Sequence, residues 1–100
     1  MNIGKAIRQL RKEKDLSQKE LADLVELSQN SLSQIEIGSK RPNPQSLQRI
    51  CKVLNTSESM LYILSVEETD VPPERKQMFD LLYPDIKSLA LKIFSGTEKF

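Results

Sequence analysis

The segment LSQKELADLVELSQNSLSQIEIG, residues 16–38, decides the fold of this chain. Near its start lies a capping box made by Ser17 and Glu20. The Ser17 hydroxyl can accept a hydrogen bond from the backbone N–H of Glu20, and the Glu20 carboxylate can accept one from the N–H of Ser17. The apolar residues that follow recur at helical spacing, so the segment predicts a helix that starts just after Ser17.

A second helix is predicted in the other half of the segment. The apolar pattern breaks at residues 26–27, and Ser28 is a favourable N-cap residue. Leu32 and Ile35 then form a narrow buried face, and Gly38 can end the helix because glycine adopts positive φ without strain. We therefore expect two short helices joined by a tight turn, the second running from about Ser28 to residue 37.

Helical patterns continue on both sides of this pair. An apolar stripe precedes it at Ile3, Ala6, Ile7 and Leu10. A fourth helix is expected after Asn43 as N-cap and Pro44 at the first helical position, with a stripe of Leu47, Ile50, Cys51 and Leu54. Thr56 or Ser57 would cap a short fifth helix that carries Met60, Leu61 and Leu64. Neither a strand pattern nor an internal repeat is visible, so the fold class predicted is all-α.

The chain divides by composition into a head, a linker and a tail. Residues 1–65 form the five-helix head, and the acidic, proline-ending stretch 66–73 has linker composition. Residues 74–95 predict a helical tail whose apolar residues follow a heptad spacing at Phe79, Leu82, Ile86, Leu89 and Ile93. Pro84 interrupts this tail, so we expect a kink or a restart of the helix there.

The composition argues against several classes of function. The 100 residues contain no histidine, one cysteine (Cys51) and three glycines, which disfavours an enzyme, a thiolate zinc site or a glycine-rich phosphate loop, and we expect no catalytic residues, metal or cofactor. The longest apolar run, residues 60–64, is too short to span a membrane, and the N-terminus is charged, so a cytoplasmic protein is expected. The head carries a net charge of +3 and residues 66–100 carry −2, a weak sign of a basic binding surface.

The outer face of the predicted third helix is rich in side-chain amides. If Leu32 points inward, a rotation of about 100° per residue directs Asn30 and Gln34 almost opposite to it, with Ser33 nearby and Gln29 to the side. Amides present a donor and an acceptor together, which suits bidentate pairing with adenine in the major groove of DNA. An ordinary solvated face has the same composition, so on these residues alone both interpretations stay open.

The wider pattern resembles the phage-repressor and Cro-like helix-turn-helix family, the XRE-type regulators. The resemblance covers roughly residues 3–64 and rests on Leu16-Ser17-Gln18-Lys19-Glu20-Leu21-Ala22, then Val25, Ser28, Leu32, Ser33, Ile35-Glu36, Gly38, Arg41-Pro42 and Leu47. It implies a repressor-like bundle in which the second and third helices form the helix-turn-helix. The family usually has glycine in the turn, where this chain has Glu26, which predicts a non-glycine residue at positive φ.

The resemblance also implies roles for individual residues. The base-reading positions would be Gln29, Asn30, Ser33 and Gln34, and the phosphate-binding positions Gln18, Ser31, Lys40 and Arg41. Arg11 and Glu36 match a structural ion pair between the first and third helices.

Two functions follow as hypotheses. The first is a sequence-specific regulator, bacterial or phage-encoded and acting as a repressor, that binds a palindromic operator as a homodimer. The second is an antitoxin-type protein whose tail binds a toxin or another protein antagonist while the head controls its own expression. The surfaces expected to bind a second copy or a partner are the fifth helix, with Met60, Leu61 and Leu64, and the tail residues Phe79, Leu82, Ile86, Leu89 and Ile93. The tail could instead fold back onto the fifth helix of its own chain.

Overall fold

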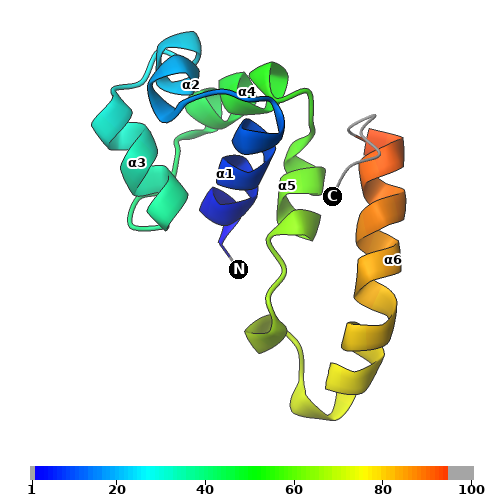
Figure 1. The fold of residues 1–100 in the computed structure, drawn as a ribbon. Helices are drawn as coiled ribbons and strands as arrows, with labels where there is room; N and C mark the ends of the chain where they lie inside the picture. Colours follow the sequence, from blue (N-terminus) through cyan, green and yellow to red (C-terminus); the bar gives the residue numbers. More distant parts are fainter. Residues whose placement is uncertain (1, 95–100) are drawn as a thin grey trace.

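The protein is helical throughout the part that the structure describes, residues 2–94 of a computed structural model (Figure 1). The elements in chain order are α1 (Ile3–Glu13), α2 (Gln18–Leu24), α3 (Gln29–Ile37), α4 (Pro44–Val53), α5 (Glu58–Leu64), two short 3₁₀ turns η1 (Glu68–Asp70) and η2 (Pro73–Arg75), and α6 (Lys76–Phe94). The predicted all-α class, with a five-helix head and a helical tail, is confirmed. Ser95, the last residue of the predicted tail, lies outside the described residues.

Side-chain caps begin the helices of the head where the local sequence predicts them. Ser28 accepts a hydrogen bond from the N–H of Ser31 at 3.0 Å, and Asn43 accepts one from Ser46 at 2.8 Å. Of the two residues considered for α5, Ser57 is the cap, since its hydroxyl accepts from the N–H of Met60. These caps occupy backbone donors that the first turn of a helix otherwise leaves unpaired.

The turn between α2 and α3 contains the expected non-glycine residue at positive φ. Glu26 has φ 59°, a conformation that costs a residue with a side chain roughly 1–2 kcal/mol. Two contacts hold the turn: the N–H of Leu27 donates to the Ala22 carbonyl at 2.9 Å, and the Glu26 carboxylate lies 3.3 Å from Nε of Arg49 on α4. The turn thus keeps the geometry of the motif without glycine.

The core of the head is built around α1, which packs on α3 and on α5, while α2 packs on α3 and α4 packs on α2 and α5. Its fully buried side chains include Ile7, Leu21, Leu32, Ile50 and Met60. At Gly4, α1 approaches α3 so closely that an added Cβ would lie 2.0 Å from the carbonyl oxygen of Ile35. This contact requires glycine because no other residue lacks the Cβ, and it places α3 directly against α1.

The tail helix α6 runs without interruption through Pro84, so the predicted restart at this proline is wrong. Contacts with the head on both sides of Pro84 support the helix despite the missing N–H. Before it, the Tyr83 hydroxyl donates to the carbonyl of Ile63, and within α6 the Tyr83 ring stacks on that of Phe79 with centroids 4.7 Å apart. After it, Ala90 and Leu91 are buried.

Because α6 lies alongside α5 (Figure 1), the tail covers the fifth helix of its own chain. Met60, Leu61 and Leu64 are at most 8% exposed, which corrects the expectation that they form a surface for a second molecule. Phe79 is half-buried, with its ring stacked on that of Tyr83. The remaining residues of the heptad pattern stay exposed: Leu82, Ile86, Leu89 and Ile93.

Candidate nucleic-acid interface

The side of α3 that faces away from the core is polar and exposed. Gln29, Asn30 and Gln34 are exposed, and Ser31 and Ser33 are half-buried beside them. Leu32 and Ile35 on the opposite side are at most 2% exposed, so their burial fixes the rotation of the helix about its axis. The five polar side chains predicted to meet DNA therefore lie on one accessible helix.

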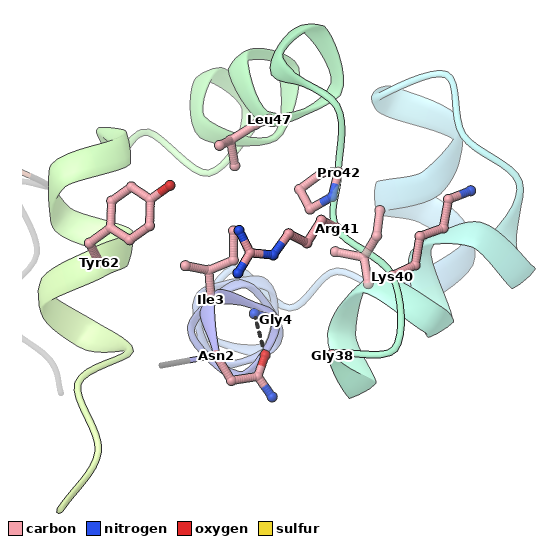
Figure 2. Close-up of a pocket in the computed structure, with 10 residues that line it drawn as sticks. Asn2, Ile3, Gly4, Gly38, Lys40, Arg41, Pro42, Leu47 and Tyr62 are labelled. Carbon is pink, nitrogen blue, oxygen red and sulfur yellow. Dashed lines mark hydrogen bonds between the residues drawn. The ribbon is translucent and has the colours of Figure 1, made fainter. Parts of the chain in front are cut away.

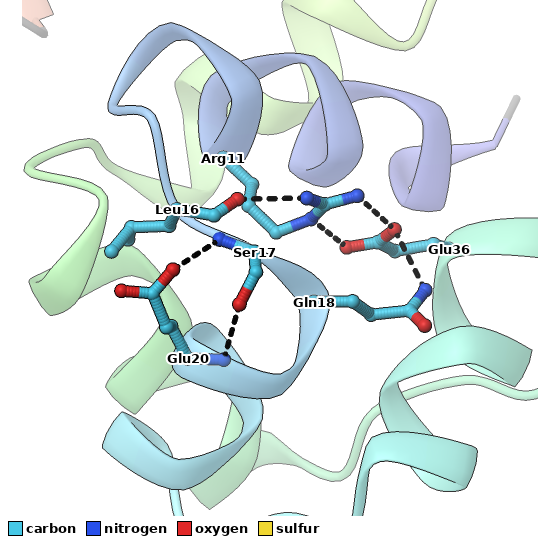
Figure 3. A network of polar contacts seen from close by, with 6 residues as sticks. All are labelled: Arg11, Leu16, Ser17, Gln18, Glu20 and Glu36. Atoms are coloured by element: carbon cyan, nitrogen blue, oxygen red, sulfur yellow. Dashed lines mark hydrogen bonds and ion pairs between the residues drawn. The ribbon is translucent and has the colours of Figure 1, made fainter.

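A network of polar contacts attaches α3 to α1 and α2 from behind (Figure 3). The Glu36 carboxylate accepts hydrogen bonds from Nε and Nη2 of Arg11 at 2.8 and 3.1 Å, in a bidentate arrangement. Nη1 of Arg11 donates to the carbonyl of Leu16 at 2.8 Å. The ion pair predicted between Arg11 and Glu36 is confirmed.

Gln18 joins the same network from the first turn of α2. Its Nε2 donates to Oε1 of Glu36 at 3.2 Å, and a side-chain amide has a second N–H that this bond leaves for another acceptor. The Arg11 and Glu36 side chains are 10% and 3% exposed, so the network excludes most water. It holds α2 and α3 in one relative orientation, which a helix that enters a DNA groove needs.

The loop after α3 begins at Gly38, with φ 92°. The N–H of Ser39 donates to the carbonyl of Gln34 at 3.0 Å, and that of Gly38 to Ile35 at 3.1 Å, so the chain turns sharply away from the helix end. The next residue, Lys40, extends back along α3, where its Nζ lies 3.4 Å from the Ser31 hydroxyl.

Lys40 and Arg41 point in different directions (Figure 2). Lys40 lies on the side of α3, whereas Arg41 extends toward Ile3 over a cavity of about 360 Å³ between α1, α4 and Tyr62. Both side chains are exposed. In this conformation Lys40 lies beside the candidate interface, and Arg41 reaches it only through a change of rotamer.

Ile37, the last residue of α3, belongs to the exposed face and was missed by the sequence analysis. It follows Gln34 by three residues and Asn30 by seven, which places it on the same side of an α-helix. Its side chain is 70% exposed, against 2% for Ile35. The helical spacing from Asn30 and Gln34 could have identified it, but the sequence analysis considered only the polar residues of this face.

Other kinds of site find little support in residues 2–94. No group of three or more acidic or cysteine side chains there could hold a metal ion. Cys51 lies in the core, and burial, followed by the charge of Glu58, raises the pKa of its thiol to about 11, so the thiol is protonated at neutral pH. None of the described helices is long and apolar enough to cross a bilayer.

Comparison with known proteins adds independent information. A family model described as helix-turn-helix matches residues 7–61. The competence pilus inhibition repressor of Acinetobacter baylyi is 35% identical over 65 residues, which is 65% of this chain and 59% of that protein. Antitoxin PezA of Streptococcus pneumoniae is 44% identical over 55 residues, 55% of this chain and 35% of the antitoxin.

Two further proteins are similar over most of this chain, tail included. The transcriptional activator BcrR of Enterococcus faecalis is 26% identical over 95 residues, 91% of this chain and 47% of BcrR. The matched region spans between 35% and 59% of the length of these three curated relatives. The crystal structure of the clp gene regulator ClgR from Corynebacterium glutamicum superposes with a TM-score of 0.65 at 23% identity, covering 86% of this chain and 92% of ClgR, so the two share a fold.

Proposed function

The chain belongs to the helix-turn-helix family, and on this premise we propose that it is a transcriptional regulator that binds a specific sequence of double-stranded DNA through α3. The observation that carries the proposal is the exposed amide face of α3, held by a buried network that joins three helices. We further propose that it acts as a repressor, as a homodimer on a palindromic operator, in the cytoplasm of a bacterium. Its head would be residues 1–65, its linker 66–73 and its tail 74–95.

In this proposal α3 lies in the major groove, which is about 12 Å wide and admits one α-helix. Asn30 and Gln34 pair with the edges of bases, adenine being the base that fits an amide best. Gln29 and Ser33 contact flanking base edges, and the exposed Ile37 packs against the methyl group of a thymine, the apolar feature of that groove.

Base reading gives a first prediction. Asn30→Ala or Gln34→Ala should lower affinity for the selected operator by about 1–3 kcal/mol for each lost bidentate contact, while affinity for unrelated DNA changes little. Fluorescence anisotropy with operator and scrambled duplexes measures both quantities. Gln48→Ala, an exposed amide on α4, is the matched control and should bind as the wild type does. Wild-type affinity and selectivity in both α3 variants would show that this face does not read bases.

The proposed phosphate contacts come from α2, from the first turn of α3 and from the loop after α3. Gln18 retains an amide N–H beyond the one that Glu36 accepts, and Ser31 and Lys40 lie 3.4 Å apart on one side of the helix. Arg41 joins them by rotating out of the cavity, since its long side chain is exposed. Cations that touch phosphates release counterions, so their contribution is measured by the salt dependence of binding.

Arg41→Ala and Lys40→Ala should each weaken binding to all DNA sequences alike and reduce the slope of log K against log salt by about one unit. Anisotropy titrations across a series of salt concentrations give the slope. Lys52→Ala, on the exposed side of α4, serves as control and should leave the slope unchanged. An unchanged slope for Arg41→Ala alone would remove Arg41 from the phosphate contacts and leave Lys40; a loss confined to one base position would contradict both assignments.

The homodimer is proposed because one head buries little DNA surface, roughly 600–1,000 Å² for a single module. Two recognition helices about 34 Å apart, one turn of B-DNA, would meet successive major grooves on one face of the duplex. The second head would then bind at high effective concentration once the first is bound.

A second candidate function is supported by the similarity to Antitoxin PezA and by the exposed apolar residues of α6. In that function the head binds DNA in the same way, and α6 binds a different protein. Selection of bound sequences from a random DNA pool, together with the mass of the complex, tests the first proposal. Enriched inverted repeats bound by two copies support it, and a failure to enrich any sequence contradicts it.

A further inference from the structure

The tail helix exposes an apolar stripe that its own head leaves uncovered. The stripe consists of five residues whose side chains are 45–73% exposed, at successive spacings of four, four, three and four: Met78, Leu82, Ile86, Leu89 and Ile93. We call these five residues the α6 stripe. The side of α6 that packs on α5 is a different one, which carries Tyr83, Ala90 and Leu91.

Among residues 2–94, the α6 stripe is exposed and takes no part in attaching α6 to the head. α6 is already attached to the head through buried side chains and the bond from Tyr83 to Ile63, so the stripe is not needed for docking. A long run of exposed apolar residues at coiled-coil spacing is unusual on a monomer and marks an interaction site. A helix of 19 residues is about 28 Å long, enough for a two-helix contact over several turns.

The charges beside the stripe indicate what covers it. Asp85 and Lys92 lie on the same edge of the stripe, two helical turns apart, and both side chains are exposed. Neither has an ion-pair partner among residues 2–94. The acid and the base occupy the same position in successive heptads. When two such helices run in opposite directions, the acid of each therefore lies near the base of the other.

From this pattern we infer that the α6 stripe binds the α6 stripe of a second copy in antiparallel orientation. The two-fold axis then crosses the helices between Ile86 and Leu89, so that Ile86 packs on Leu89 of the second copy and Leu82 on its Ile93. The same register brings Asp85 near Lys92 of the second copy, and the symmetry repeats this pair. The inference rests on the proposed homodimer and names its surface and orientation.

The parallel orientation lacks this complementarity. In a parallel pair identical residues lie at the same height, so the symmetry sets Asp85 level with Asp85 and Lys92 level with Lys92. The positions that would have to face those charges in a parallel coiled coil, those of Tyr83 and Ala90, are turned toward the chain's own α5. In the antiparallel pair the charges of the exposed edge face each other, Asp85 of one copy toward Lys92 of the other.

Charge reversal in the full chain tests the orientation. Asp85→Lys and Lys92→Asp should each weaken dimerisation by roughly tenfold, because each replaces two attractive contacts by two repulsive ones. The double variant Asp85→Lys/Lys92→Asp should return to the wild-type dissociation constant, because it exchanges the charges within every pair. Sedimentation equilibrium at low salt measures the constants, and Asp80→Lys, an exposed acid on the side of α6 away from the stripe, is the control that should leave dimerisation unchanged.

Each outcome separates the alternatives. Single variants that dimerise as the wild type does, or a double variant that stays as weak as the singles, overturn the antiparallel pairing. A wild-type chain that remains monomeric at high micromolar concentration overturns the second copy as occupant of the stripe. All the substituted side chains are exposed, so thermal melting by circular dichroism should match the wild type. If the dimerisation measurements contradict the pairing while the wild-type chain still enriches a DNA sequence, this inference alone is overturned. If the chain selects no DNA sequence, the proposed function is overturned.

Discussion

Ile86→Asp should reduce the affinity of the full chain for an operator with two half-sites by about a hundredfold, and should leave its affinity for a single half-site unchanged. Linking two heads raises the apparent affinity by roughly 10²–10⁴ without new contacts to DNA, because the second head binds within one complex. The substitution puts a charge in the middle of the apolar α6 stripe, where a second copy would have to desolvate it. The affinity gained through linkage is therefore lost, while α3 is untouched.

The experiment compares one-site and two-site duplexes in the same buffer by gel shift or anisotropy. Ser88→Asp adds the same charge to an exposed position of α6 off the stripe, so it should bind both duplexes as the wild type does. Because Ile86 is 52% exposed, the variant should fold normally, which circular dichroism verifies. Equal affinity of Ile86→Asp and wild type for the two-site duplex would show that α6 does not link the heads.

Arg11→Met should lower the free energy of unfolding by about 3–5 kcal/mol, the cost of leaving a buried charge without its partner. In the variant, the Glu36 carboxylate, 3% exposed, keeps only the hydrogen bond from Gln18. The carbonyl of Leu16 also loses its donor. A small domain is stable by only about 5–15 kcal/mol, so this single change removes a large part of its stability.

Urea denaturation followed by circular dichroism measures the loss. Arg49→Met is the matched control, because it breaks the exposed pair with Glu26, in which the side chains are 45% and 72% exposed, and should cost less than about 1 kcal/mol. Arg11→Met combined with Glu36→Leu should recover most of the stability, since replacing both members of a buried ion pair by apolar residues is often nearly neutral. Similar losses for Arg11→Met and Arg49→Met would mean that water screens the buried network.

The parts of the fold that the sequence predicted depend on interactions between residues close to each other in the chain. A cap such as Ser28 acts on a backbone group three residues away, so the residues that form it are visible together in the sequence. The outward direction of Asn30 and Gln34 follows from the burial of Leu32, because the α-helical period relates all residues of one helix to each other.

The tail shows where such reasoning failed. The heptad spacing of Phe79, Leu82 and Ile86 was interpreted as one surface, but Phe79 is half-buried beside Tyr83 while the other two residues are exposed. The pattern on α6 contains two apolar sides, one for its own α5 and one left exposed, and spacing alone does not assign residues near their boundary. At Pro84 a kink or a restart of the helix was expected, and α6 does not restart there, because contacts with the head on both sides of the proline support one continuous helix.

The sequence by itself determined the helices of the head, their order and the polar side of α3, because caps and helical periodicity act within a few residues and need no distant partner. Tertiary structure alone decided two things: that α6 covers α5 and buries Met60 and Leu61, and that Lys40 and Arg41 diverge. Each depends on contacts between residues far apart in the chain. Which of two apolar sides is buried, or which way a long side chain extends, is decided by what packs against it, and that becomes known only when the helices are placed in space.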